Sequence, residues 1–322
     1  MEFVAGNAQH IGARPEQQDA FGFSDPGNHQ FVTHAGFLGI VADGMGGLAH
    51  GSAASQTAVM TFLRAYGKKL PRESIPDALL RCLHEANNAV LGLAEKMAPQ
   101  ELGTTLVAAV LHQSRLYWIS CGDSRAYLAR GQSLTRLNAD HILAQELNRQ
   151  AAEGSISLAA AQNHPERGSL TSYLGQREIA HVDRNQQPFT VRPDDCVVLC
   201  SDGLYRAMEE EAIAAAFQGD PQLACGKLVQ QALAKQRKQQ DNLTIIALKH
   251  RSKAKLVLKS KPEAAIQRSN RRARAAAIIT LLICLSTGSG FWYGRHIYER
   301  GDGESSSQQT STPAGTDTPT AS

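Results

Sequence analysis

The sequence has few cysteines and no excess of one charge, and both shortages narrow the classes of protein to which it can belong. No two of its six cysteines have the CxxC spacing of a zinc knuckle or a redox site, so we expect free thiols in a reducing compartment. Lys and Arg total 33 against 30 for Asp and Glu, which gives no reason to expect a nucleic-acid partner. The 322 residues, 42% of them hydrophobic, exclude a disulfide miniprotein and a wholly disordered chain.

The sequence also lacks a secretory signal at its start, since residues 1–11 have neither a basic beginning nor a long apolar core. The long apolar run comes late. Residues 275–294 are 20 positions without a charged side chain, which suits a helix that crosses a bilayer. Phe291, Trp292 and Tyr293 stand near its end, and aromatic rings favour the membrane interface. A buried core helix is the alternative interpretation.

The charge beside this run indicates its orientation. Residues 249–274 hold 10 basic and 1 acidic side chains, and basic residues favour the cytoplasmic side of a membrane. We therefore expect a single-pass inner-membrane protein whose large N-terminal part is cytoplasmic. Its segments would be a globular domain over 1–248, a basic linker over 249–274, a transmembrane helix over 275–294, and a disordered Ser/Thr/Pro-rich tail over 295–322 on the far side.

Short apolar runs bounded by Gly, Asp or Ser predict strands in the first 248 residues. These runs are 37–42, 104–111, 115–120, 124–129, 196–200 and 243–248. Apolar residues at helical spacing predict helices over 51–69 and 75–97, with a shorter piece over 142–152. Early helices followed by a run of strands predict an α+β fold whose sheets are covered by helices. The polar stretch from Asp140 to Asp183 is expected to be a mobile insertion over the sheets.

Aspartate residues stand at the ends of several predicted strands. Asp43 ends one strand, and Asp123 and Asp202 each follow another. Asp241 precedes the last strand, and Asp19 is a fifth candidate. Carboxylates brought together repel one another unless a counter-charge is present, and hard divalent cations are the usual remedy because they prefer oxygen ligands. Each Asp-Gly pair taken alone is more often only a turn.

Six short motifs follow one another in an order that resembles a known family. They are Arg14-Pro15-Glu16-Gln17-Gln18-Asp19, Asp43-Gly44-Met45-Gly46-Gly47, Gly103-Thr104-Thr105, Gly122-Asp123-Ser124-Arg125-Ala126-Tyr127, Ser201-Asp202-Gly203-Leu204 and Asp241-Asn242-Leu243-Thr244. Their order and spacing over residues 5–248 resemble the metal-dependent serine/threonine phosphatases of the PP2C type, bacterial branch. The resemblance does not extend to the linker, the apolar run or the tail.

The resemblance implies a fold, a metal site and a reaction. The fold would be a PP2C-like α-β-β-α sandwich, in which a central antiparallel β-sandwich is flanked by helices. Two Mn²⁺ or Mg²⁺ ions would lie at one end of the sandwich, with a third, weaker ion nearby. The implied roles are Arg14 for the substrate phosphate, Asp43 bridging both ions, the Gly44 carbonyl on one ion, Asp202 and Asp241 on the other, Asp19 through metal-bound water, and Asp123 at the third ion. Water activated by the two ions would attack phosphorus in line, without a covalent phospho-enzyme.

Two departures from the family pattern concern this same site. Many bacterial members have a His directly after the Gly-Gly of the second motif, where it is thought to protonate the leaving group, whereas this chain has Leu48. His50 is the candidate substitute as general acid, although a His at the mouth of a polar loop is more often only solvated. Gln17-Gln18 stands where Asn or Glu is common, and Gln18 would bind metal water as a neutral group.

The expected function is metal-dependent dephosphorylation of phosphoserine and phosphothreonine in proteins. We expect substrates near the membrane and a paired Ser/Thr kinase, because tethering raises the local concentration of the enzyme. The alternative is a membrane-tethered pseudophosphatase that binds phosphoproteins or a kinase without turnover, and retention of Asp43, Asp202 and Asp241 argues against it. A metal phosphohydrolase that acts on small phosphate esters is a third interpretation, since the chemistry at phosphorus is the same.

Overall fold

The structure, a computed structural model, describes residues 2–46, 50–97 and 102–251. All of these residues belong to one compact unit, Met1–Lys259. Among them, no helix has the length and apolar character needed to cross a membrane. The predicted transmembrane helix over 275–294 and the tail over 295–322 lie outside the described residues, as does the linker beyond residue 251.

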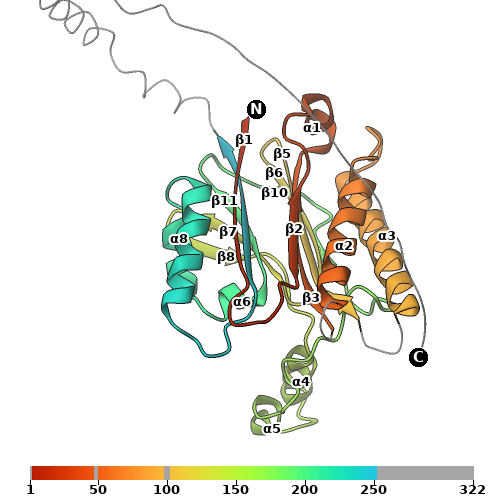
Figure 1. The fold of residues 1–322 in the computed structure, drawn as a ribbon, viewed down its shortest axis with the longest axis vertical. Coiled ribbons are helices and arrows are strands. Elements are labelled where there is room, and N and C mark those ends of the chain that lie inside the picture. Colours follow the sequence, from red (N-terminus) through yellow and green to blue (C-terminus); the bar gives the residue numbers. More distant parts are fainter. Residues whose placement is uncertain (1, 47–49, 98–101, 252–322) are drawn as a thin grey trace, which may run out of the picture. The chain divides into compact units, whose positions relative to one another are not determined.

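Two antiparallel sheets form the centre of the domain (Figure 1). The first sheet runs in the order β1 (Glu2–His10), β12 (Leu243–Arg251), β11 (Cys196–Cys200), β7 (Arg125–Arg130) and β8 (Ser133–Arg136). The second runs in the order β10 (Phe189–Thr190), β6 (Arg115–Cys121), β5 (Leu106–His112), β3 (Phe37–Met45) and β2 (Asp19–Phe23), with β4 (Gly103–Thr104) on β3 and β9 (Asp183–Arg184) on β6. β1 and β12 pair over their whole lengths, from Glu2 opposite Arg251 to His10 opposite Leu243.

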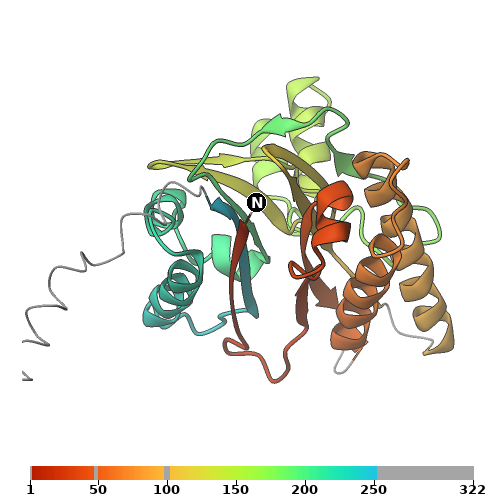
Figure 2. The same cartoon turned by 90° about the horizontal axis from the view of Figure 1, so that it is seen from above.

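Helices cover the outer faces of both sheets (Figure 2). α2 (His50–Tyr66) and α3 (Ile75–Lys96) pack on the second sheet, while α7 (Glu210–Ala216) and α8 (Pro221–Ala234) pack on the first. The shorter helices are α1 (His29–Ala35), α4 (Leu143–Ala152), α5 (Leu158–Gln162) and α6 (Asp202–Tyr205).

Successive side chains along the central strands point to opposite faces of the sheet, and this divides the core into layers. On β3, Leu38 and Ile40 face α2 and α3, whereas Phe37 and Val41 face the other sheet. Gly39 allows the two sheets to approach closely, since a Cβ there would meet Ile246 Cδ1 at 2.9 Å. A strand buried on both faces needs a continuous apolar run, and that is why these strands are visible in the sequence. The layers confirm the predicted α+β sandwich flanked by helices.

Most predicted elements are confirmed, with two corrections. Asp43 does not end a strand, because β3 continues to Met45 by pairing Gly44 with Thr104 of β4. The predicted strand over 104–111 is divided at Thr105 into β4 and β5. The cysteines in the described part of the chain are free and buried, as predicted.

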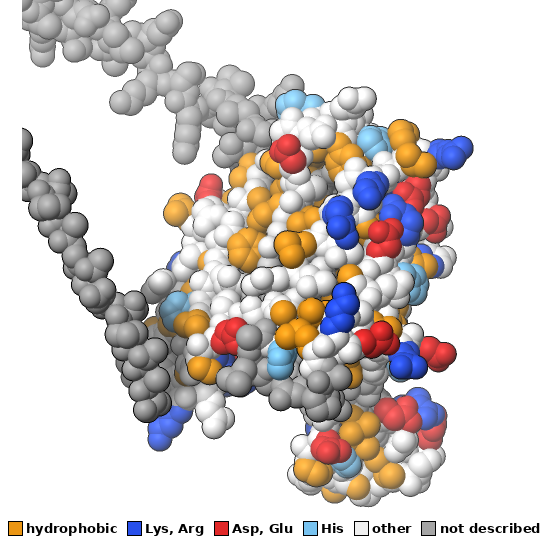
Figure 3. Space-filling model, turned by 45° about the vertical axis from the view of Figure 1, so that its right-hand side comes forward, with side chains coloured by type: hydrophobic (Ala, Val, Ile, Leu, Met, Phe, Trp, Pro, Cys, Tyr) orange, Lys and Arg blue, Asp and Glu red, His pale blue; other side chains and the backbone are white. Residues whose placement is uncertain are grey.

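Surface charge follows the composition. On the face shown in Figure 3, basic and acidic side chains lie interspersed over the helices rather than in separate fields. The near balance of 33 basic and 30 acidic residues is therefore also a local balance on this face.

Candidate active site

The predicted carboxylates meet in one cavity of about 350 Å³. Its wall contains two arginines, Arg14 and Arg206, and four aspartates, Asp43, Asp123, Asp202 and Asp241. Asp19 does not line the cavity and is buried, with only 4% of the residue exposed. The structure thus brings together all five aspartates that the sequence singled out, together with Arg14.

Strand register places the first two of these side chains. β2 and β3 pair antiparallel with Asp19 directly opposite Asp43. The backbone of Asp43 is held by Thr105, whose Oγ1 accepts from the Asp43 N–H at 3.0 Å and whose N–H donates to the Asp43 carbonyl at 2.9 Å. Asp19 Oδ2 accepts from the Ser201 hydroxyl at 2.7 Å. Both carboxylates therefore stand on backbone that is fixed within the second sheet.

Two glycines allow the surrounding segments to approach the cavity closely. A Cβ on Gly44 would meet the Gly51 carbonyl oxygen at 2.0 Å, so the start of α2 packs directly on β3. A Cβ on Gly203 would meet the Asn242 carbonyl oxygen at 2.0 Å, so α6 packs directly on the start of β12. These contacts place Asp202, the first residue of α6, near Asp241, which lies two residues before the start of β12.

Asn242 connects the N-terminal loop to the last strand, and our prediction from the sequence gave it no role. Its Nδ2 donates to the carbonyls of Ile11 at 2.8 Å and Glu16 at 3.0 Å. Its Oδ1 accepts from the Gln18 N–H at 2.7 Å. The loop that carries Arg14 is thereby held over the cavity. In the sequence, only its position within the last motif indicated that Asn242 has a role at the site.

Burial and mutual repulsion disfavour the ionised carboxylates. Burial, followed by repulsion from Asp19, Asp202 and Asp123, raises the pKa of Asp43 well above its ordinary value. Burial raises the pKa of Asp19 to about 6, and burial together with neighbouring aspartates raises the pKa of Asp202 to about 7. Bound cations would offset both effects, because their positive charge favours the ionised carboxylates and gives the buried oxygens a partner.

The donor set fits hard divalent cations. Asp19 Oδ1 and Asp202 Oδ1 are buried without a hydrogen-bond partner in the described part of the chain, and buried oxygens of this kind are suited to a metal. Within the same residues, no three His, Cys, Asp or Glu side chains are grouped so as to hold an ion by themselves. Mg²⁺ keeps several water ligands and takes only one or two carboxylates, so the arrangement is compatible with it.

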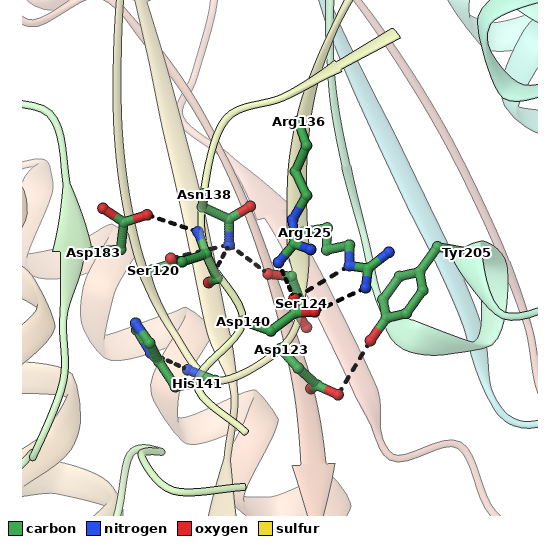
Figure 4. Close-up of polar contacts among 12 residues, drawn as sticks. Ser120, Asp123, Ser124, Arg125, Arg136, Asn138, Asp140, His141, Asp183 and Tyr205 are labelled. Atoms are coloured by element: carbon green, nitrogen blue, oxygen red, sulfur yellow. Dashed lines mark hydrogen bonds and ion pairs between the residues drawn. The ribbon is translucent and has the colours of Figure 1, made fainter. Parts of the chain in front are cut away.

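A chain of polar contacts continues from Asp123 into the insertion (Figure 4). The Tyr205 hydroxyl donates to Asp123 Oδ2 at 3.1 Å, and the Arg125 guanidinium stacks on the Tyr205 ring at 3.5 Å from its centre. Arg125 donates twice to Asp140, at 3.2 and 2.8 Å, and Arg136 also pairs with Asp140. Asp140 is the first residue of the predicted insertion, which contains α4 and α5. Gly168 and Leu170 of the insertion line the cavity, so the insertion borders the site.

The described residues that depart from the family pattern lie in different places relative to the cavity. Gln18 lines the cavity, and its Nε2 donates to the Gly46 carbonyl at 3.2 Å. His50 is the first residue of α2 and does not line the cavity, and its Nδ1 is buried without a hydrogen-bond partner in the described segments. Leu48 lies outside the described residues.

Comparisons with known proteins agree with this geometry. Residues 7–236 match the family described as "Protein phosphatase 2C". The "Serine/threonine phosphatase stp" of Listeria monocytogenes is 39% identical over 175 residues, which cover 53% of this chain and 68% of the relative. The solved structure of the Mycobacterium tuberculosis serine/threonine phosphatase PstP/Ppp has a TM-score of 0.63 and 27% identity, over 78% of this chain and 99% of that chain. The catalytic domain of PstP in complex with two manganese ions has a TM-score of 0.61 and 25% identity, over 78% of this chain and 99% of that chain.

Proposed function

Because the chain belongs to the protein phosphatase 2C family, we propose that Asp43, Asp202 and Asp241 hold the cations with which it hydrolyses phosphoserine and phosphothreonine in proteins. The chain is a metal-dependent serine/threonine protein phosphatase. The observation that supports this assignment of its site is the meeting of carboxylates from separate segments in one cavity, beside the guanidinium of Arg14.

The proposed ligands follow the sequence motifs. Asp43 would hold both ions, the Gly44 carbonyl would bind one of them, and Asp202 and Asp241 would bind the other. Asp19 would act through water, and Asp123 would be left for a third, weaker ion. Bound Mn²⁺ or Mg²⁺ would activate water for attack on phosphorus and stabilise charge on the phosphoryl oxygens.

Arg14 binds the substrate phosphate in this proposal. Its side chain is 57% exposed, and its Nη2 lies 2.7 Å from Asp241 Oδ2. A cation at Asp241 competes for that carboxylate, and a planar guanidinium then offers paired N–H donors to phosphate oxygens. His50 is the candidate proton donor to the leaving alkoxide, and in this role it would have to move toward the substrate, because it does not line the cavity. Gly51 beside it packs on Gly44, so the start of α2 is close to the backbone of Asp43.

The test is hydrolysis of a phosphothreonine peptide by the full chain with Mn²⁺, with Mg²⁺ and with EDTA. Turnover should require metal and fall at least a hundredfold, on the order expected when metal-assisted chemistry is removed, in Asp43→Asn and Asp202→Asn. Asp25→Asn, in the turn before α1, is the matched control and should leave turnover unchanged.

The same experiment separates the competing functions. A folded chain with no turnover under any metal would contradict catalysis and favour a pseudophosphatase that only binds phosphoproteins or a kinase. Turnover of a small aryl phosphate without turnover of phosphopeptides would favour a phosphohydrolase of small esters.

Membrane attachment is a further part of the proposal, and its support comes from the sequence. The uncharged run 275–294 and the basic segment 249–274 favour a single-pass inner-membrane protein with a cytoplasmic catalytic domain. Its substrates would be Ser/Thr-phosphorylated proteins at the same membrane, with a Ser/Thr kinase acting on the same proteins.

A further inference from the structure

A second arginine of the cavity has no role in the function proposed above. Arg206 directly follows α6 and lines the cavity together with Arg14. Its side chain is 53% exposed, close to the 57% of Arg14. The two guanidinium groups are thus alike in exposure, and each is paired with a carboxylate that we assign to a metal.

The contacts of Arg206 join two of the candidate ligands. Its Nη1 lies 2.9 Å from Asp202 Oδ2, and its Nη2 lies 3.5 Å from Asp123 Oδ2. A guanidinium has five N–H donors, so these two contacts leave donors for a further acceptor. The exposed part of the side chain borders the cavity in which a substrate phosphate would bind.

One of the two anchors is held firmly from behind. Asp123 Oδ2 also accepts from the Tyr205 hydroxyl at 3.1 Å, and the Tyr205 ring lies under Arg125. Arg125 is fixed by its two hydrogen bonds to Asp140 (Figure 4). Asp123 therefore keeps its place when the charges in the cavity change.

The other anchor is weakened when the site is loaded. A divalent cation on Asp202 Oδ1, the oxygen without a hydrogen-bond partner in the described residues, would draw on the same carboxylate charge that attracts Nη1 to Oδ2. Repulsion between the cation and the guanidinium acts in the same direction. The released N–H groups need a new acceptor, and phosphate oxygens match their planar geometry.

We propose that Arg206 is a second phosphate-binding arginine, which Asp123 holds in place while bound cations release it from Asp202 toward the phosphorylated residue. The inference rests on the proposed function, because it needs both the cations and a phosphate in this cavity.

The test measures binding as well as turnover. Calorimetry would give the affinity of inorganic phosphate for the full chain loaded with Mn²⁺, and the affinity of Mn²⁺ for the unloaded chain. Arg206→Gln should weaken phosphate binding about tenfold, as expected for loss of a charge-assisted hydrogen bond. Arg206→Lys should recover part of the loss, because lysine keeps the positive charge but lacks the planar pair of N–H donors. The KM for a phosphothreonine peptide should rise more than kcat falls.

Arg64→Gln is the matched control, since Arg64 is an exposed arginine of α2 that does not line this cavity. It removes the same charge and should leave phosphate affinity unchanged. Tighter Mn²⁺ binding by Arg206→Gln with unchanged phosphate affinity would overturn the inference, because Arg206 would then only neutralise carboxylates. Wild-type protein without metal-dependent turnover would instead overturn the proposed function, and this inference with it.

Discussion

At the scale of single residues, the ionised form of Asp202 is needed to bind a metal ion but destabilises the fold when no metal is bound. Burial, together with Asp123, Asp241 and Asp19, raises its pKa from 3.8 to about 7. An aspartate with a raised pKa stabilises the folded state at low pH, and that contribution is lost as the pH rises through about 7. The metal-free protein therefore has a charge in its cavity at neutral pH that opposes folding.

We expect Asp202→Asn to raise the Tm of the full chain in EDTA. The gain should be small below about pH 4, where Asp202 is protonated in both the folded and the unfolded state. It should be on the order of 5 °C at pH 8, since 1 kcal/mol shifts Tm by about 2–4 °C at this size. With saturating Mn²⁺ the order should reverse, because the wild type binds the ion better. Thermal denaturation followed by circular dichroism measures all three conditions. A variant less stable than wild type in EDTA at pH 8 would contradict the assigned direction.

His50 can be tested through the leaving group. A threonine alkoxide needs a proton to depart, whereas p-nitrophenolate departs without one. His50→Gln should therefore lower kcat for a phosphothreonine peptide about a hundredfold, within the usual range for general acid catalysis, and leave p-nitrophenyl phosphate within about twofold. An equal loss on both substrates would show that His50 is not the proton donor.

At the scale of elements, Asp140 joins the insertion to the first sheet. It is buried, and it pairs with Arg125 of β7 and Arg136 of β8. Removing one partner of a buried ion pair leaves the other charges uncompensated. Asp140→Asn should lower the free energy of unfolding by about 3 kcal/mol, as measured by urea denaturation.

The exposed ion pair on α3 provides the control for that experiment. Glu85→Gln removes the partner of Arg81, which also pairs with Glu73. An exposed i,i+4 pair contributes at most about 0.5 kcal/mol. Equal losses in the two variants would mean that Asp140 is no more important to the fold than a surface charge.

Sequence patterns predicted the helices and strands whose burial produces a regular spacing of apolar residues. β11 has the predicted bounds, Cys196–Cys200, because it is buried on both faces, and α3 was visible from its apolar stripe. β1 was missed because Gly6, Asn7 and Gln9 interrupt any apolar run, and its nine-residue ladder with β12 supplies the stability instead. The motifs marked the aspartates of the site. Arg206, outside those motifs, became visible only when α6 was placed beside Asp123.

At the scale of the whole molecule, the predicted anchor can be separated from catalysis. Deleting residues 270–322 should leave kcat/KM for a soluble phosphopeptide within about twofold, because tethering acts on local concentration only. The deletion should move the protein from the membrane fraction to the soluble fraction of lysed cells, as measured by immunoblotting. Full chain found in the soluble fraction would contradict the anchor.

Loss of the anchor should also change which proteins are dephosphorylated in cells. Phosphoproteomics should show higher phosphorylation of membrane proteins in cells with the deletion than in cells with the full chain. Unchanged phosphorylation of those proteins would contradict the proposed location of the substrates.

The pairing of the first strand with the last also determines when the protein can fold during its synthesis. β12 lies between β1 and β11 in the first sheet, so a nascent chain that ends before Leu243 leaves β1 without its neighbour. Asp241 and Asn242 arrive just before that strand, so the cavity is completed at the same late step. Contacts between distant parts of a chain form slowly and leave apolar surface exposed until then. The ribosome therefore releases an active enzyme only after nearly the whole domain has emerged, and premature termination in this region gives an inactive, aggregation-prone product.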